Sequence, residues 1–69
     1  MADNVYEAIE VIGTSTESLE KAAATAVERA SNMLRDLRVA EIAQLDMQVS
    51  NGKVEAYRAK VKLSFKFED

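Results

Sequence analysis

The sequence predicts an α+β fold of the order β-α-β-β, in which a three-stranded antiparallel sheet curls around one helix. Asn51-Gly52 is a strong turn signal, and apolar residues alternate outward from it on both sides, which is typical of a β-hairpin. Upstream, apolar residues recur every three or four positions over about residues 15–35, which is typical of a helix packed on a sheet. We predict a single domain over residues 1–69.

The first predicted strand covers about Asn4–Ile12. Its residues alternate, so that Val5, Ile9 and Val11 share one face. Gly13 is expected to end the strand. This strand can join the sheet beside the last strand, with the helix crossing one face.

The predicted helix covers about Ser15–Arg35. Thr14 followed three residues later by Glu17 indicates a capping box at its start, and Glu17 with Lys21 is expected to form an i,i+4 ion pair. The positions expected to face the sheet are spaced by three or four residues: Leu19, Ala23, Ala26, Ala30, Met33 and Leu37. Because most of these side chains are small, the helix can lie close to the strands.

The predicted hairpin is too long for this helix to cover. Its arms run from about Leu37 to Ser50 and from Lys53 to Phe67. At about 3.4 Å per residue each arm is about 45–48 Å long, whereas the helix is about 30 Å long at about 1.5 Å per residue. Part of the apolar face must therefore be covered by another chain, and we predict self-association.

The loop of the hairpin decides which residues face each other, because the apolar positions of both arms are odd-numbered. A two-residue loop would place Leu45 opposite Arg58, whereas a three-residue loop would place Leu45 opposite Tyr57. We therefore predict a three-residue loop with a type I turn, a left-handed Gly52 and a G1 bulge, or else a bulge further along an arm.

Composition narrows the classes of function. The chain has no Cys and no His, which excludes a disulfide scaffold and removes the usual ligands of zinc, copper and haem. It also leaves no obvious general base, so we predict that the protein is not an enzyme. The net charge of −3 argues against a general nucleic-acid binder. No apolar run approaches the roughly 18 residues of a membrane span, and we expect a cytoplasmic protein without a membrane partner.

Two patterns could bind anions, although each has a simpler interpretation. A basic stripe recurs on one face of the last strand: Arg58, Lys60, Lys62 and Lys66. We interpret it as a solvated face answered by acidic residues nearby, because no aromatic residue interleaves it as an RNA-binding surface would require. The Gly13–Thr16 step into the helix offers backbone N–H groups to an anion, and helix capping explains the same residues.

Several segments together resemble the dodecin family. They are Val-Ile-Gly-Thr-Ser at residues 11–15, Val39-Ala40-Glu41-Ile42, Tyr57-Arg58 and the closing Ser64-Phe65-Lys66-Phe67-Glu68. The resemblance covers almost the whole chain in length and element order. It implies a β-α-β-β fold and a hollow homododecameric shell that binds flavins for storage or quenching, without catalysis.

The resemblance also implies a site where paired flavins stack between tryptophans just after the helix. The tryptophan position falls on Val39, and the chain has no Trp. The hydrogen-bonding position after the last-strand tyrosine falls on Arg58. The candidate ligand-binding residues are Val39, Arg58 and Gln44.

Two functions remain open on these residues. The first is a dodecameric binding or storage protein whose flavin ligand, riboflavin or FMN, is bound weakly or replaced by another flat or phosphorylated molecule. The second is a shell that binds no flavin and instead holds a divalent cation, calcium or magnesium, or has a structural role. Such a cation would bind through carboxylate oxygens at a subunit contact or symmetry axis, because the chain has no EF-hand loop.

Overall fold

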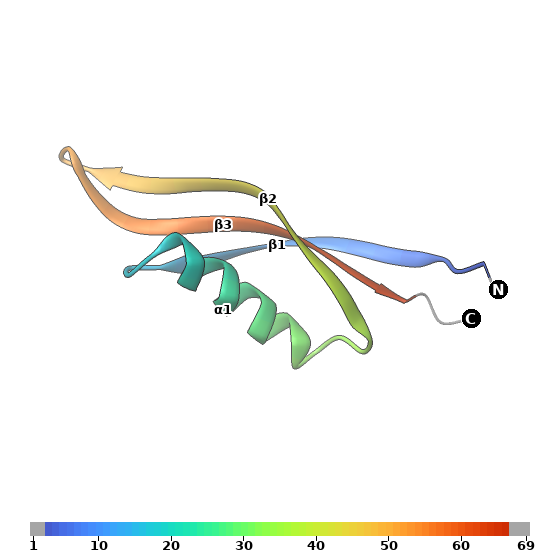
Figure 1. Cartoon of the computed structure of the whole chain (residues 1–69). Helices are drawn as coiled ribbons and strands as arrows, with labels where there is room; N and C mark the ends of the chain where they lie inside the picture. Colours follow the sequence, from blue (N-terminus) through green and yellow to red (C-terminus); the bar gives the residue numbers. More distant parts are fainter. Residues whose placement is uncertain (1–2, 67–69) are drawn as a thin grey trace.

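The computed structural model describes residues 3–66 and has the predicted order of elements (Figure 1). The elements are β1 (Tyr6–Ser15), α1 (Leu19–Ser31), β2 (Leu37–Ser50) and β3 (Lys53–Lys66). β3 is the central strand, and β1 and β2 pair with it antiparallel on either side. The α+β fold and the place of the first strand beside the last are therefore confirmed. The end of the predicted second arm, Phe67, lies outside the described residues, as does Glu68.

Gly13 lies inside β1, opposite Ala59, and the prediction that it ends the strand is wrong. A Cβ atom at Gly13 would lie 2.9 Å from the Cβ of Ala26 and would overlap the carbonyl oxygen of Ala22. The helix thus crosses the strand too closely for any side chain at this position. The strand continues beyond the glycine to Ser15.

The helix begins later than predicted. Ser18 is its N-cap, and the Ser18 hydroxyl accepts a hydrogen bond from the Lys21 N–H at 2.9 Å. The capping box predicted from Thr14 and Glu17 is therefore wrong. The Glu17 N–H instead donates to the Ser15 hydroxyl at 2.9 Å, which stabilises the turn between β1 and α1. The predicted ion pair between Glu17 and Lys21 is confirmed, at 3.3 Å on the exposed side of the helix.

The buried core is small and consists mainly of short side chains. It contains Ala22, Ala26 and Ala30 of the helix, and Ala59, Val61 and Leu63 of β3. Ala22 is fully buried although the predicted stripe omits it. Met33 belongs to the predicted stripe, yet it lies beyond the end of the helix and is 86% exposed. The helix packs on β1 and β3 and only marginally on β2.

The hairpin turn contains two residues, so the predicted three-residue loop is wrong. Ser50 pairs with Lys53, and Asn51 and Gly52 have φ of 52° and 75°. Positive φ at both central residues is the signature of a type I′ turn, which matches the twist of the strands. The predicted left-handed conformation of Gly52 is confirmed.

Bulges in the arms, which were the alternative prediction, set the register. The first lies just beyond the turn and restores pairing between odd positions, so that Leu45 faces Ala59 and Met47 faces Tyr57. The predicted pairing of Leu45 with Tyr57 is wrong by two residues, although the two side chains share a face. A second shift near Ala43 then brings even-numbered residues of β2 to that same face.

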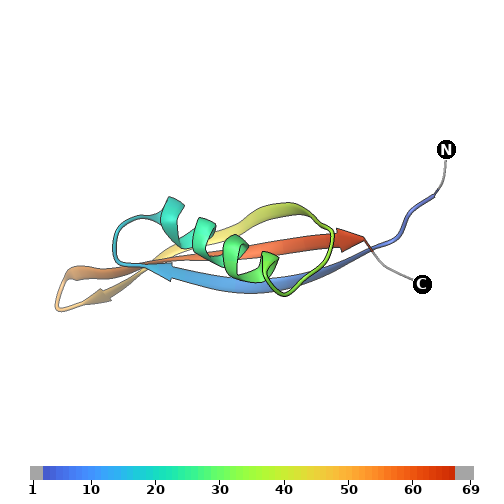
Figure 2. The same ribbon diagram turned by 90° about the horizontal axis from the view of Figure 1, so that it is seen from below.

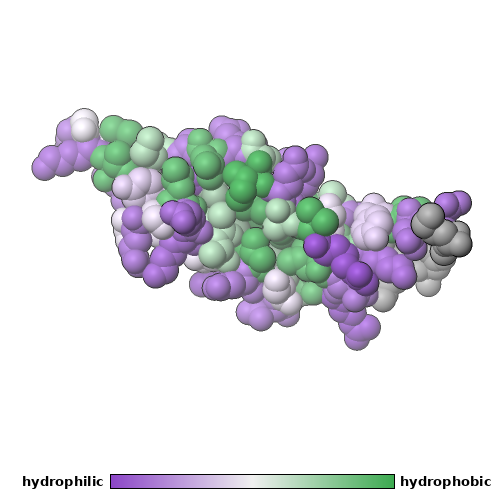
Figure 3. All heavy atoms as spheres, in the orientation of Figure 1, coloured by the Kyte–Doolittle hydropathy of each residue, from purple (hydrophilic) through white to green (hydrophobic). Residues whose placement is uncertain are grey.

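Part of the sheet face beside the helix stays uncovered. The molecule measures 53 × 19 × 15 Å, and the hairpin extends beyond the end of the helix (Figure 2). Ile42, Leu45 and Met47 on β2 are 47%, 49% and 51% exposed, and we call them the β2 apolar strip. Hydrophobic residues accordingly gather at the surface between hydrophilic margins (Figure 3). The hairpin thus exceeds the cover that its own helix provides, as the sequence predicts.

No helix within residues 3–66 is long and apolar enough to cross a membrane.

Candidate functional site

The sheet face opposite the helix is charged, and some of its opposite charges lie across from each other on neighbouring strands. The basic stripe of β3 lies on this face. The register places Asp46 opposite Arg58, and it places Lys62 between Glu10 on β1 and Glu41 on β2. Opposite charges directly across a sheet stabilise the pairing of its strands. Two of the four basic residues of the stripe, Arg58 and Lys62, therefore lie opposite carboxylates of the same chain, as the sequence analysis expects, whereas Lys60 lies opposite Ile12 and Gln44.

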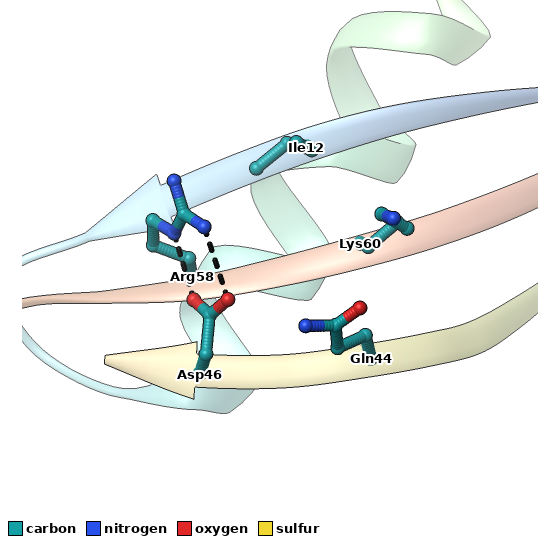
Figure 4. A pocket seen from close by; sticks show the side chains of 5 residues that line it. All are labelled: Ile12, Gln44, Asp46, Arg58 and Lys60. Carbon is teal, nitrogen blue, oxygen red and sulfur yellow. Dashed lines mark hydrogen bonds and ion pairs between the residues drawn. The ribbon is translucent and has the colours of Figure 1, made fainter. Parts of the chain in front are cut away.

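Asp46 and Arg58 form a bidentate ion pair (Figure 4). Arg58 Nε donates to Asp46 Oδ1 at 2.7 Å, and Arg58 Nη2 donates to Oδ2 at 3.0 Å. This hydrogen bonding, helped by the charges of Arg58 and Lys60, lowers the pKa of the Asp46 carboxyl below its usual value. The carboxylate in turn raises the pKa of Arg58. Both groups are therefore charged at neutral pH.

The ion pair borders a small open pocket, to which all three strands contribute. Its other lining residues are Ile12 of β1, Gln44 of β2 and Lys60 of β3 (Figure 4). Its volume of about 130 Å³ is below the roughly 300–1,000 Å³ of sites that enclose small molecules. The pocket thus offers hydrogen-bond donors, acceptors and one apolar contact, but within one chain it is too small and open to enclose a small molecule.

The structure brings two of the three predicted site residues together. Arg58 and Gln44 both line the pocket, whereas Val39 does not. Val39 pairs with Ser64, four positions along β3 from the partner of Gln44, which is about 13 Å at about 3.3 Å per residue. Val39 is 57% exposed on the same face of the sheet. A ligand that contacts Val39 and the pocket must span this distance or bridge two copies of the chain.

The shared face of Val39 and Gln44 is a consequence of the bulge near Ala43. Strict alternation along a strand would place an odd and an even residue on opposite faces. The extra residue reverses the alternation, so that both side chains lie on the charged face. Sequence periodicity alone could not show this.

Sequence reasoning missed Asp46, Lys60 and Ile12 as lining residues. The opposite charges of Asp46 and Arg58 on neighbouring arms were the available signal. That signal depends on the register, and the predicted three-residue loop would have placed Gln44 opposite Arg58. Asp46 lies opposite Arg58 only if the turn has two residues and the bulge lies further along the arms of the hairpin.

Metal ligands are sparse within one chain. Among residues 3–66, no three Asp or Glu side chains come close enough to hold an ion. The nearest approach to such a cluster in the register is Glu10 and Glu41, and Lys62 lies between them. Residues 3–66 of one chain therefore do not by themselves supply a cation site with three or more carboxylates.

The chain is similar to known proteins over nearly its full length. Residues 5–68 match the family model described as Dodecin. Calcium dodecin from Mycobacterium tuberculosis is 46% identical over 63 residues, which cover 91% of this chain and 89% of that protein. Dodecin from Thermus thermophilus is 32% identical over 65 residues, which cover 94% of each.

Solved structures agree with these matches. Dodecin from Streptomyces coelicolor superposes with a TM-score of 0.90 at 36% identity, covering 100% of this chain and 99% of that one. The crystal structure of calcium dodecin from M. tuberculosis, described as a calcium-chelating immunodominant antigen with a novel calcium-binding site, has a TM-score of 0.81 at 48% identity. That match covers 93% of this chain and 91% of the other.

Proposed function

The chain belongs to the dodecin family, and from this premise we propose that it is a non-catalytic binding or storage protein for a small ligand. In this proposal residues 1–69 form one domain, and twelve copies close into a hollow shell. The observation that carries the proposal is the β2 apolar strip of Ile42, Leu45 and Met47, which the chain itself leaves half exposed.

Assembly follows from the small core. Among residues 3–66, the buried hydrophobic residues are three alanines of the helix and three residues of β3. A core of this size rarely supplies more than about 3–5 kcal/mol. An exposed row of large apolar residues on a sheet marks an interaction surface, and a second copy of the chain offers a matching one. Burial of the strip between copies would supply the stability that the single chain lacks.

The ligand proposed first is a flavin such as riboflavin or FMN, bound through the pocket on the charged face. Gln44 offers an amide donor and acceptor, and Arg58 offers a planar guanidinium, both suited to the polar edge of a flat ring. Val39 supplies no aromatic surface, and each lost stacking contact is worth about 0.5–1.5 kcal/mol beyond area burial. The proposed binding is therefore weak.

A fluorescence titration with riboflavin tests this ligand. The native protein should bind weakly with little quenching, and Val39→Trp should tighten binding by about 1–3 kcal/mol through ring stacking. Val49→Trp is the matched control, because Val49 is a similarly exposed strand valine, at 60%, near the hairpin turn. Tight and strongly quenched binding by the native protein would contradict the assignment of Val39, as would an equal gain in the control.

The second candidate ligand is calcium, favoured by the relative named calcium dodecin at 46% identity. Since no three-carboxylate cluster exists within residues 3–66, the proposed site lies between copies. Thermal unfolding with calcium, magnesium or a chelator tests it. A rise of Tm with calcium, together with binding heat in calorimetry, would support this candidate, and the absence of both would contradict it.

A further inference from the structure

We propose that Asp46 sets the charge selectivity of the pocket by lowering its affinity for the phosphorylated form of a flat ligand relative to the uncharged form. Asp46 does so by neutralising Arg58 and by occupying one side of its guanidinium that could otherwise bind a phosphate. The inference rests on the proposed ligand site and names the class of ligand that this site takes.

The geometry of the ion pair bears on the binding of a phosphate. Arg58 uses Nε and Nη2 to hold both carboxylate oxygens of Asp46, at 2.7 and 3.0 Å. The same two parallel N–H groups of a guanidinium can also bind two phosphate oxygens bidentately. A phosphate can therefore use these two N–H groups only by displacing Asp46. Displacement would leave the Asp46 carboxylate without its partner, beside the incoming negative charge.

The charges around the pocket also bear on the binding of a phosphate. The charges of Asp46 and Arg58 cancel, so Lys60 is the remaining cation among the lining residues. Lys60 is a flexible point charge that cannot replace a bidentate contact. The whole chain carries a net charge of −3, which further disfavours an anion.

Arg58 keeps hydrogen-bond donors that Asp46 does not engage. The ion pair engages Nε and one N–H of Nη2, and within residues 3–66 Nη1 makes no hydrogen bond. Asp46 holds the guanidinium in one orientation, and the guanidinium nitrogen that makes no hydrogen bond to Asp46 points toward β1 (Figure 4). The Nη1 donors can then bind a carbonyl group of a neutral ring.

Riboflavin and FMN test the inference because they differ only by a phosphate. We expect the native protein to bind FMN no more tightly than riboflavin. In Asp46→Asn the guanidinium is free for phosphate, and the ratio of the two Kd values should shift about tenfold towards FMN. Using the ratio removes effects of the substitution on folding, because both ligands are measured on the same variant.

Asp36→Asn is the matched control, because it adds the same charge per chain. Asp36 lies in the loop before β2, 4.0 Å from Arg38, and does not line the pocket. The control should keep the native ratio of the two Kd values within about twofold, since the charge removed at Asp36 is remote from the pocket and screened by solvent. An unchanged ratio in Asp46→Asn would overturn the inference. An equal shift in Asp36→Asn would also overturn it, because bulk charge would then explain the effect.

A second measurement uses inorganic pyrophosphate, which needs no ring contact. Binding is followed by the ¹⁵N chemical shift of Arg58 Nε in the native protein and in both variants. We expect Asp46→Asn to bind pyrophosphate about tenfold more tightly than the native protein or Asp36→Asn. Failure of riboflavin and FMN to bind at all would contradict the proposed flavin ligand. Equal pyrophosphate binding by the three proteins would contradict the role of Asp46.

Discussion

The two edge strands of the sheet have the same central neighbour but very different cover. β1 lies beneath the helix, and Gly13 allows the helix to approach its backbone closely. β2 lies beyond the helix and keeps Ile42, Leu45 and Met47 half exposed. The unit of β1, α1 and β3 is therefore stabilised from within the chain. The apolar residues of β2 lack such a cover within the chain, so in the proposed assembly contacts between copies would stabilise this strand.

The largest expected effect contrasts a covered leucine with an uncovered one. Leu63 is fully buried beneath the helix, so Leu63→Ala should lower the free energy of unfolding by about 2–5 kcal/mol. Leu45→Ala removes the same group from the β2 apolar strip. Its destabilisation should depend on protein concentration, because it acts through association. Denaturant unfolding at several protein concentrations measures both.

Two outcomes would break this contrast. A concentration-independent loss in Leu45→Ala equal to that in Leu63→Ala would mean that β2 is covered within its own chain. A negligible loss in Leu63→Ala would mean that the covered unit is not the stable part of the subunit.

The two glycines give a smaller contrast between a crowded and an open position. Gly13→Ala places a Cβ against the backbone of α1, and overpacking of this kind costs about 1–3 kcal/mol. At Gly52 no atom lies within 4 Å of an added Cβ, so Gly52→Ala should cost about 1 kcal/mol through its positive φ alone. Denaturant midpoints measure both costs. A greater loss at Gly52 than at Gly13 would contradict the close crossing of the helix over β1.

The smallest expected effect concerns the ion pair on the charged face of the sheet, to which all three strands contribute. The pKa of Asp46 is lowered in the folded chain from its usual 3.8, so the ion pair with Arg58 stabilises the fold above that pH. The contribution is lost as the pH falls through the lowered folded pKa. Asp46→Asn should therefore have a lower Tm than the native protein at pH 7, with a difference that shrinks below pH 3.8. A difference that stays constant with pH would contradict the role of this ion pair.

The sequence predicted the elements of the fold better than their ends. The alternation around Asn51-Gly52 predicts both long strands, and the bounds Leu37–Ser50 are confirmed. The helix start was assigned to Thr14, although Ser18 performs the capping, because several hydroxyl residues in a row can cap equally well on sequence grounds. Met33 fits the helical spacing but lies past the helix end, since periodicity does not mark where a helix stops.

The candidate site was less predictable because it depends on register. Arg58 and Gln44 were identified and do share a pocket, whereas Asp46 was missed. Each bulge adds one residue and reverses which side chains share a face, and no residue type marks its position uniquely. The hairpin length could still be predicted, because it depends only on counting residues. The uncovered face of β2 was therefore predictable, although its composition was not.

The mass of the protein in solution tests the central claim, that another copy covers the β2 apolar strip. Size-exclusion chromatography with light scattering should give about twelve times the 7.6 kDa of one chain. Leu45→Glu should form a smaller species, because a charge buried between apolar surfaces is costly. Met33→Glu, at an exposed residue outside the sheet, should keep the native mass. A native protein that is monomeric or dimeric at micromolar concentration, or a Leu45→Glu variant that keeps the full assembly, would contradict the claim.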